Sequence, residues 1–231
     1  LAAENISSRL LMEYFSEQAT ETESDFNRYI NENGVSLMSN SDADLVLTAK
    51  FAAANIPLVD KSQLIQALTK SYRKETSIEK VSATLWGLSE LGQPLLNTVD
   101  ILSKEKNTPR GQIYLGLAFA AQGDKFSAGK IFDEIISKYG VRQDPFLFVK
   151  TNSNEQDTVE DTALTMILSA KIGSIENQEK LWSYLNIAKS EDQIYVLEKA
   201  ITLQSSIVSY PFSPSEFEYS LAGKKYVQKI T

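Results

Sequence analysis

Apolar residues recur along most of the chain at the three- and four-residue spacing of an amphipathic helix. In the first such segment, Ile6, Leu10, Leu11, Tyr14 and Phe15 share one helical face. The same pattern returns from segment to segment, and it predicts an all-α fold of about ten helices. We expect these helices over 4–18, 42–55, 61–68, 78–91, 94–102, 109–121, 125–139, 157–172, 176–187 and 192–208, with a further helical turn near 26–30.

Capping residues and helix breakers support these boundaries. A Ser, Thr or Asp immediately before an apolar periodic segment accepts a hydrogen bond from the first turn of the helix. Glycine is favoured just past a helix end, and proline cannot continue a helix. The expected caps are Ser41, Asp60, Ser77, Thr108 and Asp124, and the expected terminators are Pro57, Gly92, Gly123, Gly140 and Gly173.

The helices fall into antiparallel pairs whose units start near residues 41, 77, 108 and 157. A spacing of this kind is typical of helical repeat proteins. Several pairs combine one helix rich in small residues, such as Ala118, Ala120 and Ala121, with a bulkier second helix. That asymmetry favours two concentric layers, although an open solenoid of similar pairs is equally compatible with the periodicity.

Two segments depart from the helical pattern. After Gly140 the chain has its longest break, in which Phe146–Val149 is either a short strand or an apolar plug against the core. After residue 209, Phe217, Tyr219 and Leu221 alternate with polar residues before an expected turn at Gly223-Lys224. This alternation predicts a β-hairpin. We therefore divide the chain into a helical domain over 1–208 and a linker with the first strands of a following β domain over 209–231.

Glycines inside the helical segments have a packing interpretation. Gly111, Gly116 and Gly129 are isolated within otherwise helical patterns. Glycine costs stability in a helix interior, so it is retained there where another backbone approaches closely. We expect close helix contacts at these three positions.

Size, composition and charge exclude several classes of function. The chain has 231 residues, with 42% hydrophobic and 23% charged residues, which is the balance of a globular protein. Its formal charge of -7 makes nucleic acid an unfavourable partner. We find no apolar run of the roughly 20 residues that a membrane-spanning helix needs. The absence of Cys and His removes thiolate metal sites and imidazole bases, and we expect no cofactor.

Paired carboxylates are the best candidates for enzyme chemistry. An inverting glycosidase or a lyase on a helical ring would use two such acids. The pairs also lie at predicted helix starts, where acids stabilise the helix dipole, and capping is our preferred interpretation. The pairs are Asp42 with Asp44, Glu160 with Asp161, and Glu191 with Asp192; of these, Asp42, Asp44 and Asp161 are the candidate cleft residues.

Three large aromatic residues allow the same two interpretations. Trp86, Trp182 and Tyr114 would suit a sugar-binding cleft. Their positions follow the helical spacing of the core, so we expect them to be packing residues.

The first eleven residues, LAAENISSRLL, resemble the opening of the thioester domain of alpha-2-macroglobulin-like proteins, in which a Cys-x-Glu-Gln run leads into a Ser-Arg-Leu-Leu helix. Glu4 and the Ser8–Leu11 segment match, whereas Ala2 stands in place of the Cys and Asn5 in place of the Gln. Three later segments are similar to the family in the same order, namely 34–50, 83–92 and 112–124. The resemblance extends over roughly residues 1 to 208.

The two departures remove the family's reactive group. A Cys and a Gln one helical turn apart face each other, so that the thiol displaces the glutamine amide and forms an internal thioester. Ala2 has no nucleophile, and the Asn5 carboxamide is one methylene shorter than that of Gln. The expectation is therefore a thioester-type domain without a thioester.

The resemblance also implies a fold, a location and partners. It implies an alpha/alpha toroid inside a larger, extracytoplasmic protein of bacterial type, which entraps proteases. The chain starts at Leu1 without a signal segment and ends in a strand-like pattern, so we expect it to be part of a longer polypeptide. Its partners would then be the β domains of its own chain and target proteases. Alternatives are a carbohydrate-active enzyme on a toroid and an open repeat scaffold that binds a peptide.

Overall fold

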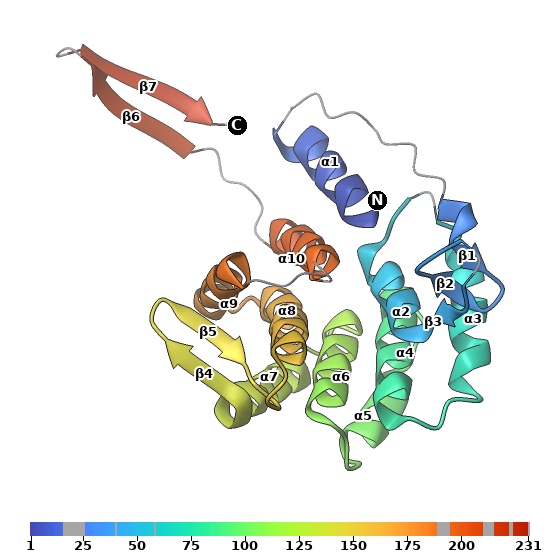
Figure 1. The fold of residues 1–231 in the computed structure, drawn as a ribbon. Coiled ribbons are helices and arrows are strands. Elements are labelled where there is room, and N and C mark those ends of the chain that lie inside the picture. The colour runs from blue at the N-terminus through green and yellow to red at the C-terminus, as the bar shows by residue number, and fades with distance from the viewer. Residues whose placement is uncertain are drawn as a thin grey trace.

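The structure, a computed structural model, describes residues 1–15, 26–39, 41–57, 59–188, 195–209, 215–221 and 224–230 (Figure 1). Within these residues the fold is mainly helical, as the periodicity predicts. The ten helices described are α1 (Ala2–Phe15), α2 (Leu45–Ala54), α3 (Lys61–Tyr72), α4 (Ile78–Glu90), α5 (Leu96–Ser103), α6 (Pro109–Ala121), α7 (Lys125–Tyr139), α8 (Glu155–Ile172), α9 (Ile175–Ile187) and α10 (Val196–Ser209), with a 3-10 turn η1 (Phe26–Arg28).

The helices belong to two classes that differ in burial. In α8, twelve of eighteen residues are buried, and in α4 and α6 eight of thirteen are buried, so these helices are covered on nearly all sides. In α3 and α7 only three residues each are buried, on one face. A helix that is enclosed all round belongs to the interior, whereas one with a single buried face belongs to the outside.

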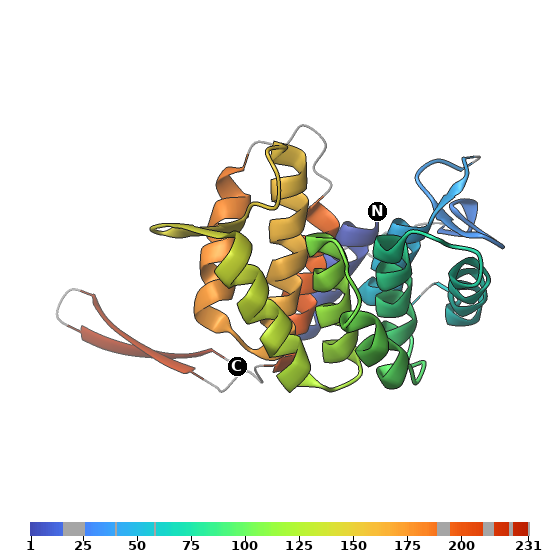
Figure 2. The ribbon, with the colours of Figure 1, turned by 90° about the horizontal axis from the view of Figure 1, so that it is seen from below.

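The contacts between helices follow the same division. α4 packs between α2 and α6, α8 packs between α6 and α10, and α10 also contacts α2 (Figures 1 and 2). On the outside, α3 lies on α4, α5 and α7 lie on α6, and α9 lies on α8. α1 packs on α10 and reaches α2. Interior and exterior helices therefore alternate along the chain from α2 to α10.

Three small antiparallel pairings complete the fold. β1 (Ile30–Asn31), β2 (Gly34–Ser36) and β3 (Ala43–Asp44) form a sheet in the order β1-β2-β3 that the sequence did not predict. It is fastened to α2, because the Val35 N–H donates to Thr48 Oγ1 at 2.9 Å. Strands of two or three residues are too short to produce a recognisable alternation.

Both interpretations of Phe146–Val149 are confirmed, because the segment is a strand and two of its side chains are buried in the core. β5 (Phe146–Val149) pairs with β4 (Gly140–Gln143), while Leu147 and Val149 are fully buried. The C-terminal hairpin is also confirmed: β6 (Ser215–Leu221) pairs with β7 (Lys224–Ile230). Lys224 pairs with Leu221 and so belongs to the strand, and the turn residues 222–223 lie outside the described residues.

Most of the predicted helix starts are confirmed. Asp60, Ser77, Thr108 and Asp124 each accept a hydrogen bond from the first turn of their helix. The prediction for Ser41 is wrong, because Asp44 caps α2 by accepting from the Leu47 N–H. α8 begins at Glu155 after the cap Asn154, two residues earlier than predicted. The predicted end of the first helix at residue 18 and the predicted helix start at Asp192 lie outside the described residues.

Close helix contacts occur at some of the glycines. A Cβ added at Gly116 would lie 2.9 Å from Leu168 Cδ2, so the expectation there is confirmed. At Gly111 the nearest atoms to an added Cβ belong to the side chain of Asn107, in the segment that connects α5 to α6, and not to another helix. At Gly129 it would meet nothing within 4 Å, so that expectation is wrong. Among the described glycines, the closest approach to the backbone of another helix is at Gly87 of α4, where an added Cβ would lie 2.8 Å from Ala49 Cα of α2.

Gly87 and Gly129 provide a matched pair of substitutions. Gly87→Ala is expected to lower the free energy of unfolding by about 1–3 kcal/mol, because the α2 backbone cannot move away without disturbing the core. Gly129→Ala is expected to raise it by about 0.5–1 kcal/mol through helix propensity alone. Urea unfolding of both variants tests this contrast. Equal effects in the two helices would contradict the packing of α4 on α2.

Candidate functional site

Ala2, Glu4 and Asn5, the residues compared with a thioester motif, lie in the first turn of α1. Ala2 and Asn5 are partly buried, and the Asn5 N–H donates to the Leu1 carbonyl at 2.9 Å. Residues three apart on such a turn are neighbours on the helix surface. Glu4 is exposed. These three side chains thus comprise a methyl group, an amide and a solvated carboxylate.

Further along, α1 connects the first and last interior helices. Arg9 donates from one guanidinium nitrogen to the Asn55 carbonyl at the end of α2, at 3.3 Å. With the Gln204 amide oriented to satisfy both neighbours, its oxygen accepts from Arg9 at 3.0 Å and its nitrogen donates to the Ala54 carbonyl at 3.1 Å. Ile6 is fully buried beneath the helix. α1 therefore covers the contact between α2 and α10.

Asp42 and Asp44 lie at the start of α2 but have different roles there. Asp44 Oδ1 accepts from the Leu47 N–H at 2.7 Å as the cap of α2, which confirms the capping interpretation. Asp42 is exposed just before β3. Glu191 and Asp192 lie outside the described residues.

Asp161 has a different role from the one that its position predicted. It lies in the second turn of α8 and does not cap the helix. Its side chain is 1% exposed, and its oxygens accept from Arg110 Nε of α6 and, at 2.6 Å, from Thr151 Oγ1. Arg110 also contacts Asp157 at 2.9 Å and Glu160 at 3.3 Å. The capping interpretation of Asp161 is therefore wrong, because its carboxylate joins α8 to α6.

Deeper in the molecule, a lysine lies between two glutamates. Lys50 Nζ of α2 lies 3.0 Å from Glu160 of α8 and 2.6 Å from Glu198 of α10. The Lys50 side chain is 7% exposed and that of Glu198 is fully buried. Glu160 contacts both Lys50 and Arg110, so the two groups form one network. We call it the ion cluster; its members are Lys50, Arg110, Asp157, Glu160, Asp161 and Glu198.

Burial dominates the protonation of the deepest members. It raises the pKa of Glu198 above the usual value even though Lys50 acts in the opposite direction. It also raises the pKa of Asp161 against the effects of Arg110 and Thr151. Burial alone would lower the pKa of Lys50, but Glu198 and Glu160 outweigh it and raise that pKa. At the exposed edge, a hydrogen bond from Asn152 and the contact with Arg110 lower the pKa of Asp157.

The aromatic residues near the cluster belong to the core. Trp86 and Tyr114 are fully buried and stack with ring centroids 5.7 Å apart, so a sugar-cleft role for them is wrong. Burial raises the pKa of the Tyr114 hydroxyl, which has no hydrogen-bond partner within the described residues. Trp182 is partly buried against the core, with Lys199 Nζ 5.5 Å from its ring centre.

The arrangement of charges is suited to holding helices together. Two cations and four carboxylates connect α2, α6, α8 and α10. Carboxylates that are bound to Lys50 and Arg110 are poor general acids or bases, since each proton transfer would break an ion pair. Across the part of the chain that the structure describes, no group of three or more His, Cys, Asp or Glu side chains is arranged to hold a metal ion. Among those same residues no helix is long and apolar enough to cross a membrane.

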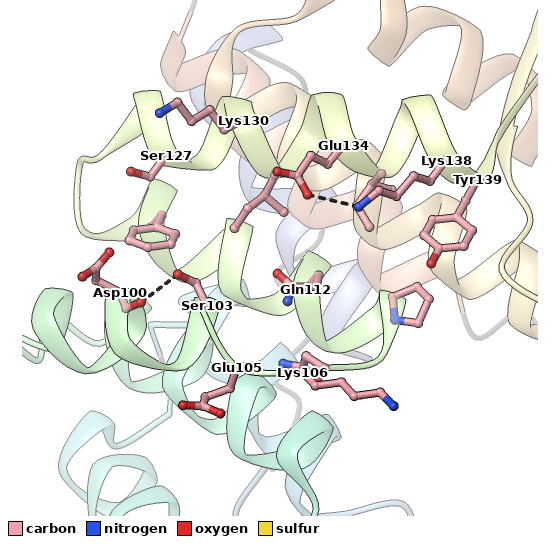
Figure 3. A pocket seen from close by; sticks show the side chains of 15 residues that line it. Asp100, Ser103, Glu105, Lys106, Gln112, Ser127, Lys130, Glu134, Lys138 and Tyr139 are labelled. Carbon is pink, nitrogen blue, oxygen red and sulfur yellow. Dashed lines mark hydrogen bonds and ion pairs between the residues drawn. The ribbon is translucent and has the colours of Figure 1, made fainter.

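A separate groove lies on the outside of the molecule. It has a volume of about 460 Å³ and runs between α5 and α7 over α6 (Figure 3). Apolar lining comes from Phe119, Ile131 and Ile135. Charged and polar lining residues include Asp100, Ser103, Lys106, Lys130, Glu134 and Lys138.

Sequence reasoning missed Lys50, Arg110 and Glu198. Lys50 is the one charged residue in the α2 sequence LVLTAKFAAA, and a lone charge in an apolar helix is a signal for a buried partner. Arg110 and Glu198 lie in the first turns of their helices, where they resemble ordinary surface residues. Their pairing depends on which helices meet, and the chain pattern does not contain that information.

No family model matches the chain, and no curated protein matches it significantly.

The coupling between Lys50 and Glu198 can be measured by a double-mutant cycle. Lys50→Met leaves the buried Glu198 carboxylate without its cation, while Glu160 keeps its contact with Arg110, and is expected to cost about 3–5 kcal/mol of unfolding free energy. Glu198→Gln leaves Lys50 paired with Glu160 and is expected to cost about 1 kcal/mol or less. The double variant should be more stable than the sum of the single effects predicts. Strict additivity in urea unfolding would exclude a direct interaction.

The raised pKa of Glu198 has a defined consequence for stability. The folded state holds this proton at a pH at which the unfolded chain, with a Glu pKa of about 4.3, has released it. The carboxyl therefore contributes most below the unfolded pKa, and its contribution is lost as the pH rises through the folded pKa. Relative to Glu198→Gln, the wild type should lose unfolding free energy as the pH rises above the unfolded Glu pKa of about 4.3. The opposite trend would mean that Lys50, not burial, determines this pKa.

Proposed function

We propose that this chain is a non-catalytic helical domain of an alpha-2-macroglobulin-like protein, and that it takes part in steric trapping of proteases without a reactive thioester. The observation that carries the proposal is the start of α1. Ala2 and Asn5 stand at the positions of the family's Cys and Gln, and they lie one turn apart on a helix. The pair has neither a nucleophile nor a glutamine side chain, so covalent capture has no chemical basis here.

We further infer that the interior helices form the closed alpha/alpha toroid of that family. Alternation of enclosed and one-faced helices supports two concentric layers. The contact of α10 with α2, covered by α1, supports closure rather than an open solenoid. A closed ring presents a rigid outer surface, which is the property that a steric trap requires.

The carbohydrate-enzyme alternative has less support. Of the three candidate acids, Asp44 caps α2 and Asp161 is bound by Arg110 and Thr151. Asp42 is exposed just before β3. An inverting mechanism needs two carboxyl groups that face a common substrate, and these side chains contact different partners.

The proposal also specifies partners and location. The partners are the β domains of the same polypeptide and target proteases, and the location is outside the cytoplasm. Both follow from the family resemblance. The net charge of -7 makes nucleic acid unfavourable as a partner, and no step of the proposed function needs a cofactor.

Steric trapping has a distinctive activity pattern. When the polypeptide that carries this domain is incubated with proteases of several classes, cleavage of large protein substrates should fall while cleavage of small peptides persists. Denaturing electrophoresis should find no covalent adduct, because Ala2 has no thiol. Unchanged cleavage of large substrates, or an adduct stable to denaturation, would contradict the proposal.

A variant that restores both residues provides the control. Ala2→Cys with Asn5→Gln recreates the two reacting groups, so a covalent protease adduct should appear and methylamine should prevent it. The single variant Ala2→Cys should give a free thiol and no adduct. If the thiol of the double variant reacts as readily as that of the single variant, no thioester has formed. The start of α1 is then not a degenerate thioester site.

A further inference from the structure

Lys50 and Glu198 are the most deeply buried ion pair among the described residues. Lys50 Nζ lies 2.6 Å from Glu198 Oε1, and the two side chains are 7% and 0% exposed. Because a carbon–oxygen bond adds about 1.2 Å to that distance, Nζ is within about 3.8 Å of the Glu198 carboxyl carbon. Reacting atoms that are about 3–3.5 Å apart are close to an attack geometry. The amine on α2 is therefore placed beside a carboxyl carbon on α10.

The surroundings of Glu198 favour the neutral form of its carboxyl group. Among the described residues, no hydrogen bond of ordinary geometry reaches either of its oxygens, so the contact with Lys50 is what stabilises the anion. Burial outweighs that contact and raises the pKa of Glu198. A carboxylate repels a nucleophile, whereas a protonated carboxyl is an electrophile whose hydroxyl can leave as water. Glu198 is thus held in the form that an amine can attack.

Glu160 supplies the proton acceptor that the amine needs. Its Oε1 accepts a hydrogen bond from Lys50 Nζ at 3.0 Å, and Arg110 lies 3.3 Å from its other oxygen. Its side chain is 23% exposed, so a proton taken from Lys50 can pass to solvent. Proton transfer breaks an ion pair and is therefore rare. One event per molecule is enough, because an amide is stable once it has formed.

We propose that Lys50 and Glu198 condense to an amide that covalently joins α2 to α10. Glu160 removes one proton from the Lys50 ammonium group, and the free amine attacks the carboxyl carbon of protonated Glu198. The new bond between Nζ and Cδ replaces one bond between Cδ and oxygen. The hydroxyl leaves as water with a second proton from the amine, the amide keeps the third, and Glu160 releases its proton to solvent. The reaction needs no other reactant, and it does not depend on the function proposed above.

The amide changes both the electrostatics and the connectivity of the interior. It replaces a buried ammonium group and a buried carboxyl with one neutral group, which removes the cost of keeping charge away from water. Glu160 retains its contact with Arg110. The bond joins the first and last interior helices, so α10 cannot separate from α2. The structure describes the unlinked pair, and the urea experiments on Lys50 and Glu198 refer to molecules in that state.

Intact mass and peptide mapping of the full chain test the proposal. On prolonged incubation the folded wild type should become lighter by about 18 Da, the mass of one water. Trypsin should then release a branched peptide in which residues 29–61, uncleaved at Lys50, are joined to residues 190–199. Protein kept in denaturant should retain its full mass, because the two side chains meet only in the folded state. A folded wild type that keeps its full mass would overturn the proposal.

A second ion pair in the same molecule serves as an internal control. Lys171 Nζ lies 2.8 Å from Glu90, which also accepts a hydrogen bond from Trp86 Nε1. Both side chains are more exposed than those of Lys50 and Glu198, and Glu90 is the one carboxylate that pairs with Lys171 among the described residues. No peptide linked between Lys171 and Glu90 should appear. Linkage there as extensive as at Lys50 would mean that proximity alone, and not this site, drives the reaction.

Two isosteric variants test the part played by Glu160. Glu160→Gln removes the proton acceptor and should slow the loss of water at least about tenfold. Asp157→Asn also neutralises a carboxylate of the ion cluster, but one that contacts Arg110 and not Lys50, and it should link at the wild-type rate. Equal rates in Glu160→Gln and the wild type would contradict the proposed reaction.

Discussion

Lys50 lies 3.0 Å from Glu160 and 2.6 Å from Glu198, and these side chains come from α2, α8 and α10. Removing charges from water is costly, and the cost is offset only where opposite charges meet in good geometry. A lysine on α2 that is 7% exposed therefore constrains where α8 and α10 can lie. Arg110 extends the constraint to α6 through Asp157, Glu160 and Asp161. Four interior helices thus share one electrostatic requirement, in addition to the nonspecific requirement that their apolar faces be buried.

Close packing between the interior helices stabilises the fold in addition to the ion cluster. Ala49 of α2 contacts Gly87 of α4 almost backbone to backbone, and Gly116 of α6 admits Leu168 of α8. Such close approaches allow each interior helix to be covered on all sides, while the exterior helices contribute one apolar face each. The groove between α5 and α7 is a consequence of this layering, because exterior helices that lie on a common interior helix leave its surface accessible between them.

Helix caps could be predicted from the sequence, whereas contacts between residues on different helices could not. The caps Asp60, Ser77, Thr108 and Asp124 depend only on neighbours within three residues, and all four are confirmed. Lys50 and Glu160 are 110 residues apart, so no local pattern indicates that they meet. The same limit explains the glycines, since Gly87 and Gly129 look alike in sequence and differ only in what packs on them. Asp161 was assigned to capping for this reason, because its partner Arg110 lies on another helix.

Hydrogen exchange, followed by mass spectrometry on the wild type and on Lys50→Met, tests most directly whether the ion cluster fastens α10 to α2. The account predicts slow exchange in α2, α8 and α10 of the wild type. It also predicts that Lys50→Met accelerates exchange in these helices more than in α4, which is as deeply buried but contributes no residue to the cluster. The account would be contradicted if α10 exchanged as fast as the exterior helix α5 in the wild type, or if Lys50→Met accelerated α4 as much as α10.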